Sequence, residues 1–301
     1  MVSASERAKL EERSARLQRL SRKRFGVVRV VFLQNPMSTV GVVLVVALLL
    51  VAALGPLMAP YDPNDTNPRV RMSPPSASHP FGTDSYGRDV LSRVLAAARV
   101  DLTIAVVAVS ISLVIGTTIG ALTGYFGGWL DMVVMRVLDA LQSFPQFILA
   151  MGLAAAMGPG VRNLIIVIAI VMTPGSARIM RSRIISLREM AFVDAARIAR
   201  VPTWRIISAH LVPNGIGPVI VHAALALSFA MLDAAGLSFI GLGVRPPQAE
   251  WGTMISDGVG NLLAGEWWVS VFAGLALFIS VLGFNLFGDG LRDILDPRMR
   301  R

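Results

Sequence analysis

Cysteine is absent from the 301 residues, which excludes disulfide bonds, thiolate metal sites and a cysteine nucleophile. Charge is also scarce, because Asp, Glu, Lys and Arg make up 16% of the chain, whereas soluble domains average about 25%. Hydrophobic residues make up 54%, and the mean hydropathy is +0.64. Such a chain has too few polar side chains to cover a soluble domain, so the composition predicts a membrane protein with several spans.

Common signatures of catalysis are missing as well. The only lysines are Lys9 and Lys23, and neither follows a glycine, so the Gly-Lys-Ser/Thr loop that binds phosphates is absent. The three histidines, His79, His210 and His222, are scattered and form no metal-ligand spacing such as HExxH. A G-x-S-x-G nucleophile elbow does not occur either. The sequence therefore predicts no catalytic residue, cofactor site or metal site on this chain.

Six hydrophobic runs each approach the ~20 residues that cross a bilayer. Because backbone groups in lipid must form hydrogen bonds within their own segment, the runs are predicted to be helices. The fold class is therefore an all-α integral membrane protein with six transmembrane helices. The third run is expected to bend at Pro145, and the fourth is the least regular because it contains Pro174 and Arg178. The predicted spans are 38–59, 102–125, 133–157, 161–178, 215–236 and 268–288.

Basic residues gather in two parts of the sequence and predict its orientation. The first 37 residues hold nine Lys and Arg against three acids, and residues 178–205 hold seven arginines. The segment between the last two spans holds one arginine, Arg245, against three acids. By the positive-inside rule, both termini and the segment after the fourth span are predicted to be cytoplasmic. The net charge of +9 would suit binding to nucleic acid, but the basic residues lie at the ends of hydrophobic runs, which argues against that partner.

Residues 194–214, DAARIARVPTWRIISAHLVPN, form a polar segment between two predicted spans. Residues 191–201 can wind as a short helix, and small side chains such as Ala195 and Ala196 would let it press closely against another protein. Pro202 ends or restarts this helix. The residues alone leave two interpretations open, which are a docking knob for a partner protein and a connector whose arginines anchor to lipid headgroups.

This segment resembles the EAA loop of permease subunits in binding-protein-dependent ABC importers, which reads Glu-Ala-Ala, three residues, Gly, nine residues and Ile-x-Leu-Pro. Asp194 stands at the Glu position, Arg200 at the usual glycine, and His210 and Val212 at the Ile and Leu positions. Glycine permits a sharp turn, so Arg200 is expected to keep that turn with strain, to shift the end of the helix, or to add a charge contact with the partner. In that family the loop is a coupling helix that docks on an ATPase subunit. The resemblance thus implies an ATPase-coupling role for Asp194, Ala195, Ala196, Arg197, Arg200, His210 and Pro213.

Three further segments resemble the second permease subunit of the dipeptide, oligopeptide and nickel importer group. They are HPFGTDSYGRDVLSR (79–93), GLSFIGLGVRPPQAEWGTMI (236–255) and NLFGDGLRDILDPR (285–298), and the resemblance runs from about residue 25 to the C-terminus. It implies a type I ABC importer permease in a bacterial cytoplasmic (inner) membrane. It also implies a homologous permease, two ABC ATPase subunits that carry ATP and Mg, and an external binding protein that delivers a peptide. The chain itself would be no enzyme and would carry no cofactor.

Other functions are weighed against this one. An ion-driven secondary carrier would need inverted repeats and buried acids at mid-membrane, and the sequence shows neither. An intramembrane hydrolase would need the nucleophile or metal signatures that are missing. Nickel chelates and other peptide-like solutes stay open as substrates, because in this family the binding protein carries most of the selectivity.

The predicted organisation is a basic cytoplasmic leader, a first span, an external loop with an interfacial helix, a five-helix transporter domain and a cytoplasmic tail. The leader is expected either to lie as a helix on anionic lipid or to remain a mobile tail. The corresponding ranges are 1–37, 38–59, 60–101, 102–290 (with the coupling helix at about 191–201) and 291–301.

The external loop contains four charged residues that are spaced for pairing along one helix face. This helix is expected either to touch the binding protein or the sister subunit, or to form a self-contained cap. The residues are Asp84, Arg88, Asp89 and Arg93.

Polar residues within the predicted spans are candidates for a translocation path, since ionisable groups at membrane depth usually face a cavity or protein. Alternatively, the histidine packs between helices, the aspartate caps a helix end, and the amides bond to neighbouring helices. The candidates are Gln142, Gln146, His222 and Asp233. In the second span, glycines repeat every four residues and predict close contact with another helix; they are Gly116, Gly120 and Gly124.

Overall fold

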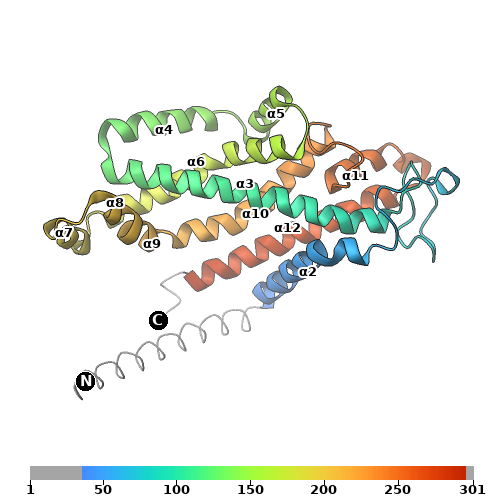
Figure 1. Ribbon diagram of the computed structural model, residues 1–301, viewed down its shortest axis with the longest axis horizontal. Helices are drawn as coiled ribbons and strands as arrows, with labels where there is room; N and C mark the ends of the chain where they lie inside the picture. The colour runs from blue at the N-terminus through green and yellow to red at the C-terminus, as the bar shows by residue number, and fades with distance from the viewer. Residues whose placement is uncertain (1–35, 296–301) are drawn as a thin grey trace, which may run out of the picture.

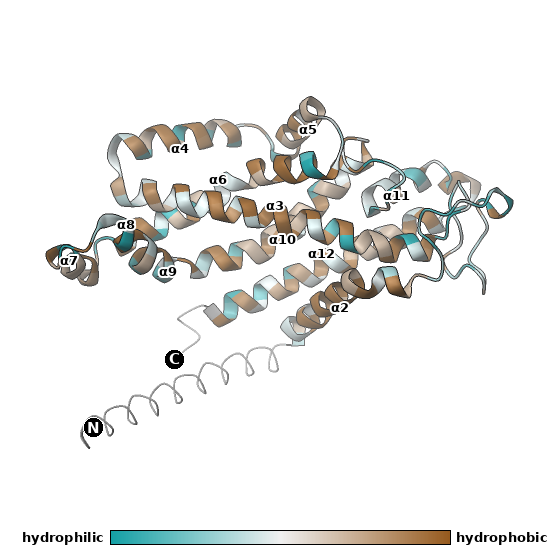
Figure 2. Cartoon of the chain, in the orientation of Figure 1, coloured by the Kyte–Doolittle hydropathy of each residue, from teal (hydrophilic) through white to brown (hydrophobic). Residues whose placement is uncertain are grey.

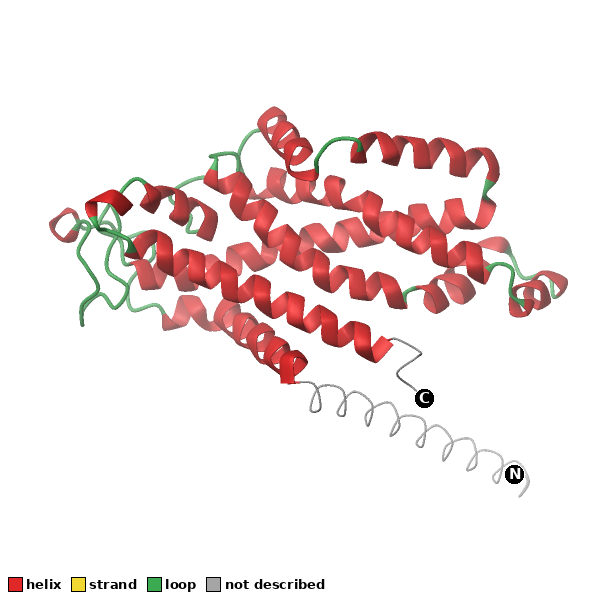
Figure 3. Cartoon of the chain, turned by 180° about the vertical axis from the view of Figure 1, so that it is seen from behind, coloured by secondary structure: helices red, strands yellow, loops and turns green. Residues whose placement is uncertain are grey.

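The computed structural model describes residues 36–295, and over that range the chain consists of helices and loops without a strand (Figures 1 and 3). Five helices are long and apolar enough to cross a membrane, and a bent helix pair supplies a sixth candidate span. The all-helical membrane fold is thus confirmed. The leader and the end of the tail lie outside the described residues. The long helices are α2 (Pro36–Met58), α3 (Val90–Phe126), α6 (Val161–Leu187), α10 (Gly217–Phe239) and α12 (Trp268–Leu295).

The third predicted span is broken rather than gently bent. It consists of α4 (Gly128–Gln142) and α5 (Gln146–Met157), whose axes differ by 88°. Pro145 immediately precedes α5, and its ring removes the N–H that a continuous helix would need. The predicted bend is therefore in the right place, and it is sharp enough to divide the span into two half-helices.

The second span begins earlier than predicted. The side chain of Asp89 accepts a hydrogen bond from the Ser92 backbone N–H and caps α3 at Val90. Residues 90–101 contain neither glycine nor proline, and they run without interruption into the apolar part of α3. The prediction of a separate interfacial helix in the external loop is therefore wrong. Across residues 59–89 the one helical turn is η1 (Pro68–Val70).

The glycine repeat on α3 makes the predicted close contact with another helix, which is α6. A Cβ added to Gly120 would lie 2.2 Å from the backbone oxygen of Ala177, and one added to Gly116 would lie 2.6 Å from the Ser176 side chain. Only glycine permits these backbones to approach so closely. The contact extends along α6 to Ile184, past the proline and arginine that made the fourth run look irregular. The α3–α6 pair forms the centre of the bundle.

Shorter elements lie at the two ends of the bundle (Figure 1). Figure 2 shows hydrophobic residues along the long helices and hydrophilic residues concentrated in the end segments. One end carries α7 (Ala191–Ile198), α8 (Thr203–Arg205), the π-helical turn η2 (Ile206–Leu211) and α9 (Val212–Gly215). The other end carries residues 59–89, α11 (Trp251–Val259) and η3 (Leu262–Ala264).

Candidate functional site

The predicted coupling segment forms a small knob beyond the bundle. Val193 is the one fully buried side chain of helix α7, and it lies in an apolar cluster with residues of α6 and η2. Of the two alanines predicted to contact the ATPase, Ala195 is exposed, while Ala196 is partly buried against the same cluster. Because so few side chains of the helix are buried, most of its surface is left free for another protein. Val193 contacts a cluster that contains Ile184, Leu187, Ile206 and Leu211.

Arg200 adopts the conformation that the family's glycine would supply. Its φ is +55°, in the left-handed region that L-residues other than Asn and Asp rarely enter. Its N–H donates to the Arg197 carbonyl at 2.9 Å, and the Val201 N–H donates to the Ala196 carbonyl at 3.0 Å. These two bonds are a Schellman motif. Of the expectations for Arg200, the strained turn is the one observed, at a cost of roughly 1–2 kcal/mol.

The free surface of the knob is apolar with basic residues beside it. Ile198 is 83% exposed and Trp204 is 65% exposed, with Met190 and Phe192 also exposed. The Arg205 guanidinium lies 5.4 Å from the centre of the Trp204 ring. Water-exposed apolar side chains gathered on one small segment are typical of a protein-binding surface.

The charged residues of α7 make contacts within the chain itself. Arg197 donates to the Asp194 carboxylate at 3.1 Å, and its guanidinium lies 5.8 Å from the Tyr125 ring of α3. The position that the family fills with Glu therefore holds an Asp paired to its own helix. His210 and Pro213 do not lie on α7. They lie in η2 and α9, where the His210 carbonyl accepts the Asn214 side-chain amide, and they shape the entry to α10.

Sequence reasoning did not identify the residues that brace the knob. Arg188, just after α6, donates to the carbonyls of Gly124 and Tyr125 at 3.0 and 3.3 Å and so caps the end of α3. Arg181 of α6 makes a two-bond ion pair with Asp131 of α4. Three helices thus meet at the base of the segment. These partners are 50 to 64 positions apart in the chain, so local spacing carries no signal for them.

At the opposite end, the four predicted charged residues do not share a helix face. Asp84 and Arg88 lie in a loop, Asp89 is the cap of α3, and Arg93 lies on α3. The Arg88 guanidinium donates to Asp84 at 2.6 Å, while Asp89 bonds His79 at 2.9 Å. All four are buried, and they do not line the single helix face that their spacing predicted. They form a polar brace because the loop folds back on the start of α3.

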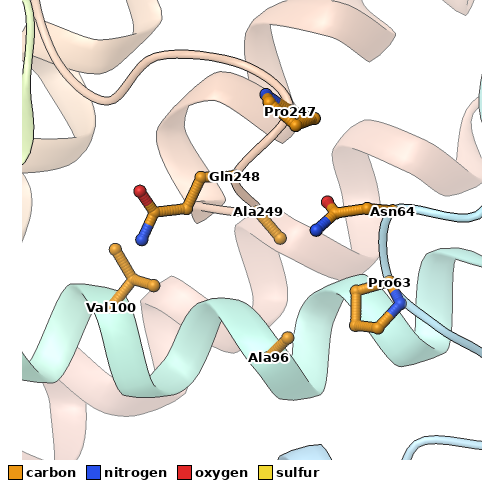
Figure 4. Close-up of a pocket in the computed structure, with 7 residues that line it drawn as sticks. All are labelled: Pro63, Asn64, Ala96, Val100, Pro247, Gln248 and Ala249. Atoms are coloured by element: carbon orange, nitrogen blue, oxygen red, sulfur yellow. The ribbon is translucent and has the colours of Figure 1, made fainter.

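Arg93 extends this brace to the other external segment. Its guanidinium donates to the carbonyls of Pro63 and Pro247 at 3.0 and 3.3 Å. A hollow of about 230 Å³ lies beside these contacts. Figure 4 shows its residues around the hollow, from the loop, α3 and the segment before α11: Pro63, Asn64, Ala96, Val100, Pro247, Gln248 and Ala249.

The start of α11 is held by two buried carboxyl groups that sequence reasoning also missed. Glu250 caps the helix by accepting the Gly252 and Thr253 N–H groups at 2.9 and 2.8 Å. Asp101 of α3 accepts the Trp251 N–H at 3.1 Å. Burial raises the pKa of Glu250 above its usual range, and the backbone hydrogen bonds oppose that shift. The two acids fasten α11 to α3.

Three of the four path candidates gather near the break between α4 and α5. The Gln146 amide donates to the Asp233 carboxylate at 2.8 Å, and Gln142 ends α4. Since α10 continues to Phe239, Asp233 is inside the helix and does not cap its end. His222 is apart from this group. It packs beside Gly175 of α6 and lies about 16 Å from Asp233 along the helix axis, at 1.5 Å per residue.

Comparison with known proteins identifies the family of this chain. Residues 116–301 match the family described as the inner membrane component of binding-protein-dependent transport systems. The chain belongs to this family. Residues 19–75 also match the N-terminal transmembrane domain of oligopeptide transport permease C. The chain is therefore a membrane component of an ABC importer, and family members do not hydrolyse ATP themselves.

Several relatives are similar to this permease over nearly their full length. The dipeptide transport system permease protein of Alkalihalophilus pseudofirmus is 42% identical, with 89% of this chain and 88% of the relative covered. The probable D,D-dipeptide transport system permease protein of Escherichia coli is 39% identical, with 96% and 97% covered. The glutathione transport system permease protein of Pectobacterium atrosepticum is 35% identical, with 89% of each covered.

Proposed function

We propose that this permease is one of two membrane subunits of an ATP-driven peptide importer. It would pair with a homologous permease, two ATPase subunits that bind ATP and Mg, and an external binding protein that delivers the peptide. The named functions of the relatives, which include dipeptide and glutathione transport, support a peptide substrate. Membership of the binding-protein-dependent family argues against the alternative of an ion-driven secondary carrier.

The observation that carries the coupling role is the exposed surface of α7. In this proposal α7 and the adjoining Trp204 dock in an ATPase cleft, which closes when ATP binds. The knob rests on α6 and α3 through Val193 and Arg188, so a displacement of the ATPases is passed to the central helix pair. ATP shifts the equilibrium between inward- and outward-open states because the ATPases bind it more tightly in one of them.

The orientation follows from the arginines around α7. Residues 188–205 and both termini lie on the cytoplasmic side in this proposal, while α11 and residues 59–89 lie outside. Asp233, Gln142, Gln146 and His222 line or approach the translocation path, since polar groups at this depth require water or protein beside them.

Ala195→Trp tests the coupling role. In the full complex reconstituted in nanodiscs, we expect the ATP hydrolysis stimulated by loaded binding protein to fall about tenfold, because overfilling a close contact costs roughly 1–3 kcal/mol. Peptide uptake in vesicles should fall in parallel. Ala53→Trp is the matched control, since Ala53 is exposed on α2 and far from the knob. Undiminished stimulation and uptake in Ala195→Trp would show that α7 is only a connector.

A further inference from the structure

The break between α4 and α5 borders an open hollow of about 510 Å³. An ion pair lies at its edge, where the Arg178 guanidinium of α6 donates to the Asp139 carboxylate of α4 at 2.5 Å. The side chains are 47% and 51% exposed, so both charges remain open to whatever fills the hollow. The lining includes Gln142, Ser143, Phe144, Gln146 and Leu149.

This hollow is at membrane depth. Arg178 lies nine residues before the inner end of α6, or about 14 Å at 1.5 Å per residue. Gln146, at the opposite side of the lining, bonds Asp233, which lies six residues or about 9 Å from the outer end of α10. A half-exposed ion pair in this zone would be costly against lipid tails. The hollow therefore faces water or protein.

The other side of the bundle is different. Every exposed residue of α2 from Val40 to Leu57 is apolar, as a lipid-facing helix requires. Figure 1 shows α2 along one edge of the bundle, with α4 and α5 along the opposite edge. The broken span agrees with this assignment, because non-helical backbone at membrane depth persists only in protein or beside a water-filled cavity.

The ion pair between Arg178 and Asp139 is not needed to hold α4 against α6. Arg181 and Asp131 already connect the two helices with two hydrogen bonds, and their side chains are 33% and 18% exposed. Arg178 and Asp139 are the more open pair and have two amides and a hydroxyl in the same lining. They present one cation, one anion and several hydrogen-bonding groups to a single space.

We infer that this hollow is a contact site for the zwitterionic peptide in transit, with Arg178 binding its carboxylate and Asp139 binding its ammonium group. The inference rests on the proposed peptide import. A guanidinium pairs well with a carboxylate through parallel hydrogen bonds. Half-exposed charges bind weakly in water. Weak contact suits a path that must release its cargo after admitting it.

The absence of cysteine from the natural chain permits a direct test. We would assemble the full complex with Ser143→Cys, on a cysteine-free background for the partners, and measure its labelling by a sulfonated methanethiosulfonate reagent. We expect labelling at Ser143→Cys and none at Leu50→Cys, which lies on the lipid-facing side of α2. Dialanine delivered by its binding protein in the presence of ATP and vanadate should suppress the Ser143→Cys labelling.

Arg178→Gln then tests whether the positive charge of Arg178 contacts the peptide. In the Ser143→Cys background it should raise the dialanine concentration for half-protection about fivefold, as expected for loss of a half-exposed charge contact. Arg178→Lys should recover part of the protection. Arg162→Gln is the matched control, because Arg162 is exposed near the other end of α6 and does not line the hollow; it should leave the half-protection concentration unchanged.

Three results would overturn the site. Absence of Ser143→Cys labelling would show that the sister permease fills the hollow, and labelling that dialanine does not change would show water without peptide contact. Equal half-protection in Arg178→Gln and in the parent would remove Arg178 from the site. Dialanine import by the same preparation separates the two proposals. No import by the parent complex contradicts the peptide function, whereas normal import with an unprotected cysteine contradicts this site alone.

Discussion

At the scale of single residues, Arg200 shows how this chain keeps a turn without the usual glycine. The Schellman hydrogen bonds at its neighbours require a positive φ, and an arginine accepts that conformation only with strain. Its side chain is exposed, so the backbone rather than packing determines the local energy.

Arg200→Gly should therefore stabilise the permease by about 1 kcal/mol, since glycine adopts this φ at no steric cost. The thermal unfolding midpoint of the purified complex measures the gain. Stimulated ATP hydrolysis should be retained. Arg197→Gly, the same substitution inside α7, should instead destabilise by about 1 kcal/mol. A stable Arg200→Gly complex without stimulation would show that the guanidinium contacts the ATPase.

Glu250 makes the outer end of the molecule sensitive to pH. Its carboxyl is buried, which raises its pKa, so the folded state binds a proton more tightly than the unfolded chain does. The stability from this proton is fully present below the unfolded pKa, about 4.3, and is lost as the pH rises through the higher folded value.

Glu250→Gln should reduce this dependence, because the amide is neutral. Gly252 and Thr253 donate to different carboxyl oxygens, and the amide keeps one of these two acceptors, so a loss of stability that does not vary with pH is also expected. We expect the unfolding midpoint of the variant to rise relative to that of the parent as the pH increases from about 4.3 through the folded pKa. Glu266→Gln, in the same outer segment, is the comparison substitution. A variant that is equally destabilised at every pH would show that Glu250 is an ionised cap in the folded protein.

At the scale of elements, the close contact between α3 and α6 holds the bundle together. The glycines of α3 lie directly against the α6 backbone, and the 88° break puts α4 and α5 outside this central pair. The proposed coupling knob lies at one end of this pair, and the external brace is attached to the start of α3 at the other end. Any loosening of this contact should therefore affect both ends.

Gly120→Ala should destabilise the permease by roughly 1–3 kcal/mol, because a methyl group forced against backbone atoms separates the helices. The added Cβ would be 2.2 Å from the Ala177 carbonyl oxygen. Gly152→Ala on α5 is the control, since its Cβ would have nothing within 4 Å. Denaturant unfolding of the two variants should separate them, and equal stability would contradict the packing argument.

At the scale of the whole molecule, the two ends have different chemistry. The end with α7 carries an excess of arginine, whereas the end with α11 carries acids, prolines and the buried brace. This asymmetry is what the positive-inside rule uses to orient a membrane protein. In the proposed importer, the ATPases lie at the first end and the binding protein at the second.

Reporter insertions test this orientation. Alkaline phosphatase inserted at Leu263, which is fully exposed in η3, should be active because it folds outside the cytoplasm. The same enzyme inserted at Glu189, which is exposed beside α7, should be inactive. The reverse pattern would invert the proposed topology and place α7 away from cytoplasmic ATPases.

Local chemistry was sufficient to predict much of this protein. Apolar run length determines which segments cross a bilayer, a proline removes an N–H wherever it occurs, and glycines four residues apart share one helix face; these are properties of neighbouring residues. The break at Pro145, the close packing of the glycine face of α3 and the start of α7 were predictable for that reason. The early start of α3 was not predicted, because the residues before it are typical of a loop. Asp89 nevertheless caps the helix at Val90.

Only the tertiary structure determined which polar residues meet. Gln146 and Asp233 are 87 positions apart, and Arg178 and Asp139 are 39 apart, so their pairing depends on how far each helix slides and turns against the next. Side-chain packing between helices sets that shift, and no spacing along one helix encodes it. The buried acids at α11 and the hollow beside the broken span arise in the same way, since each is built from segments that become neighbours only when the bundle closes.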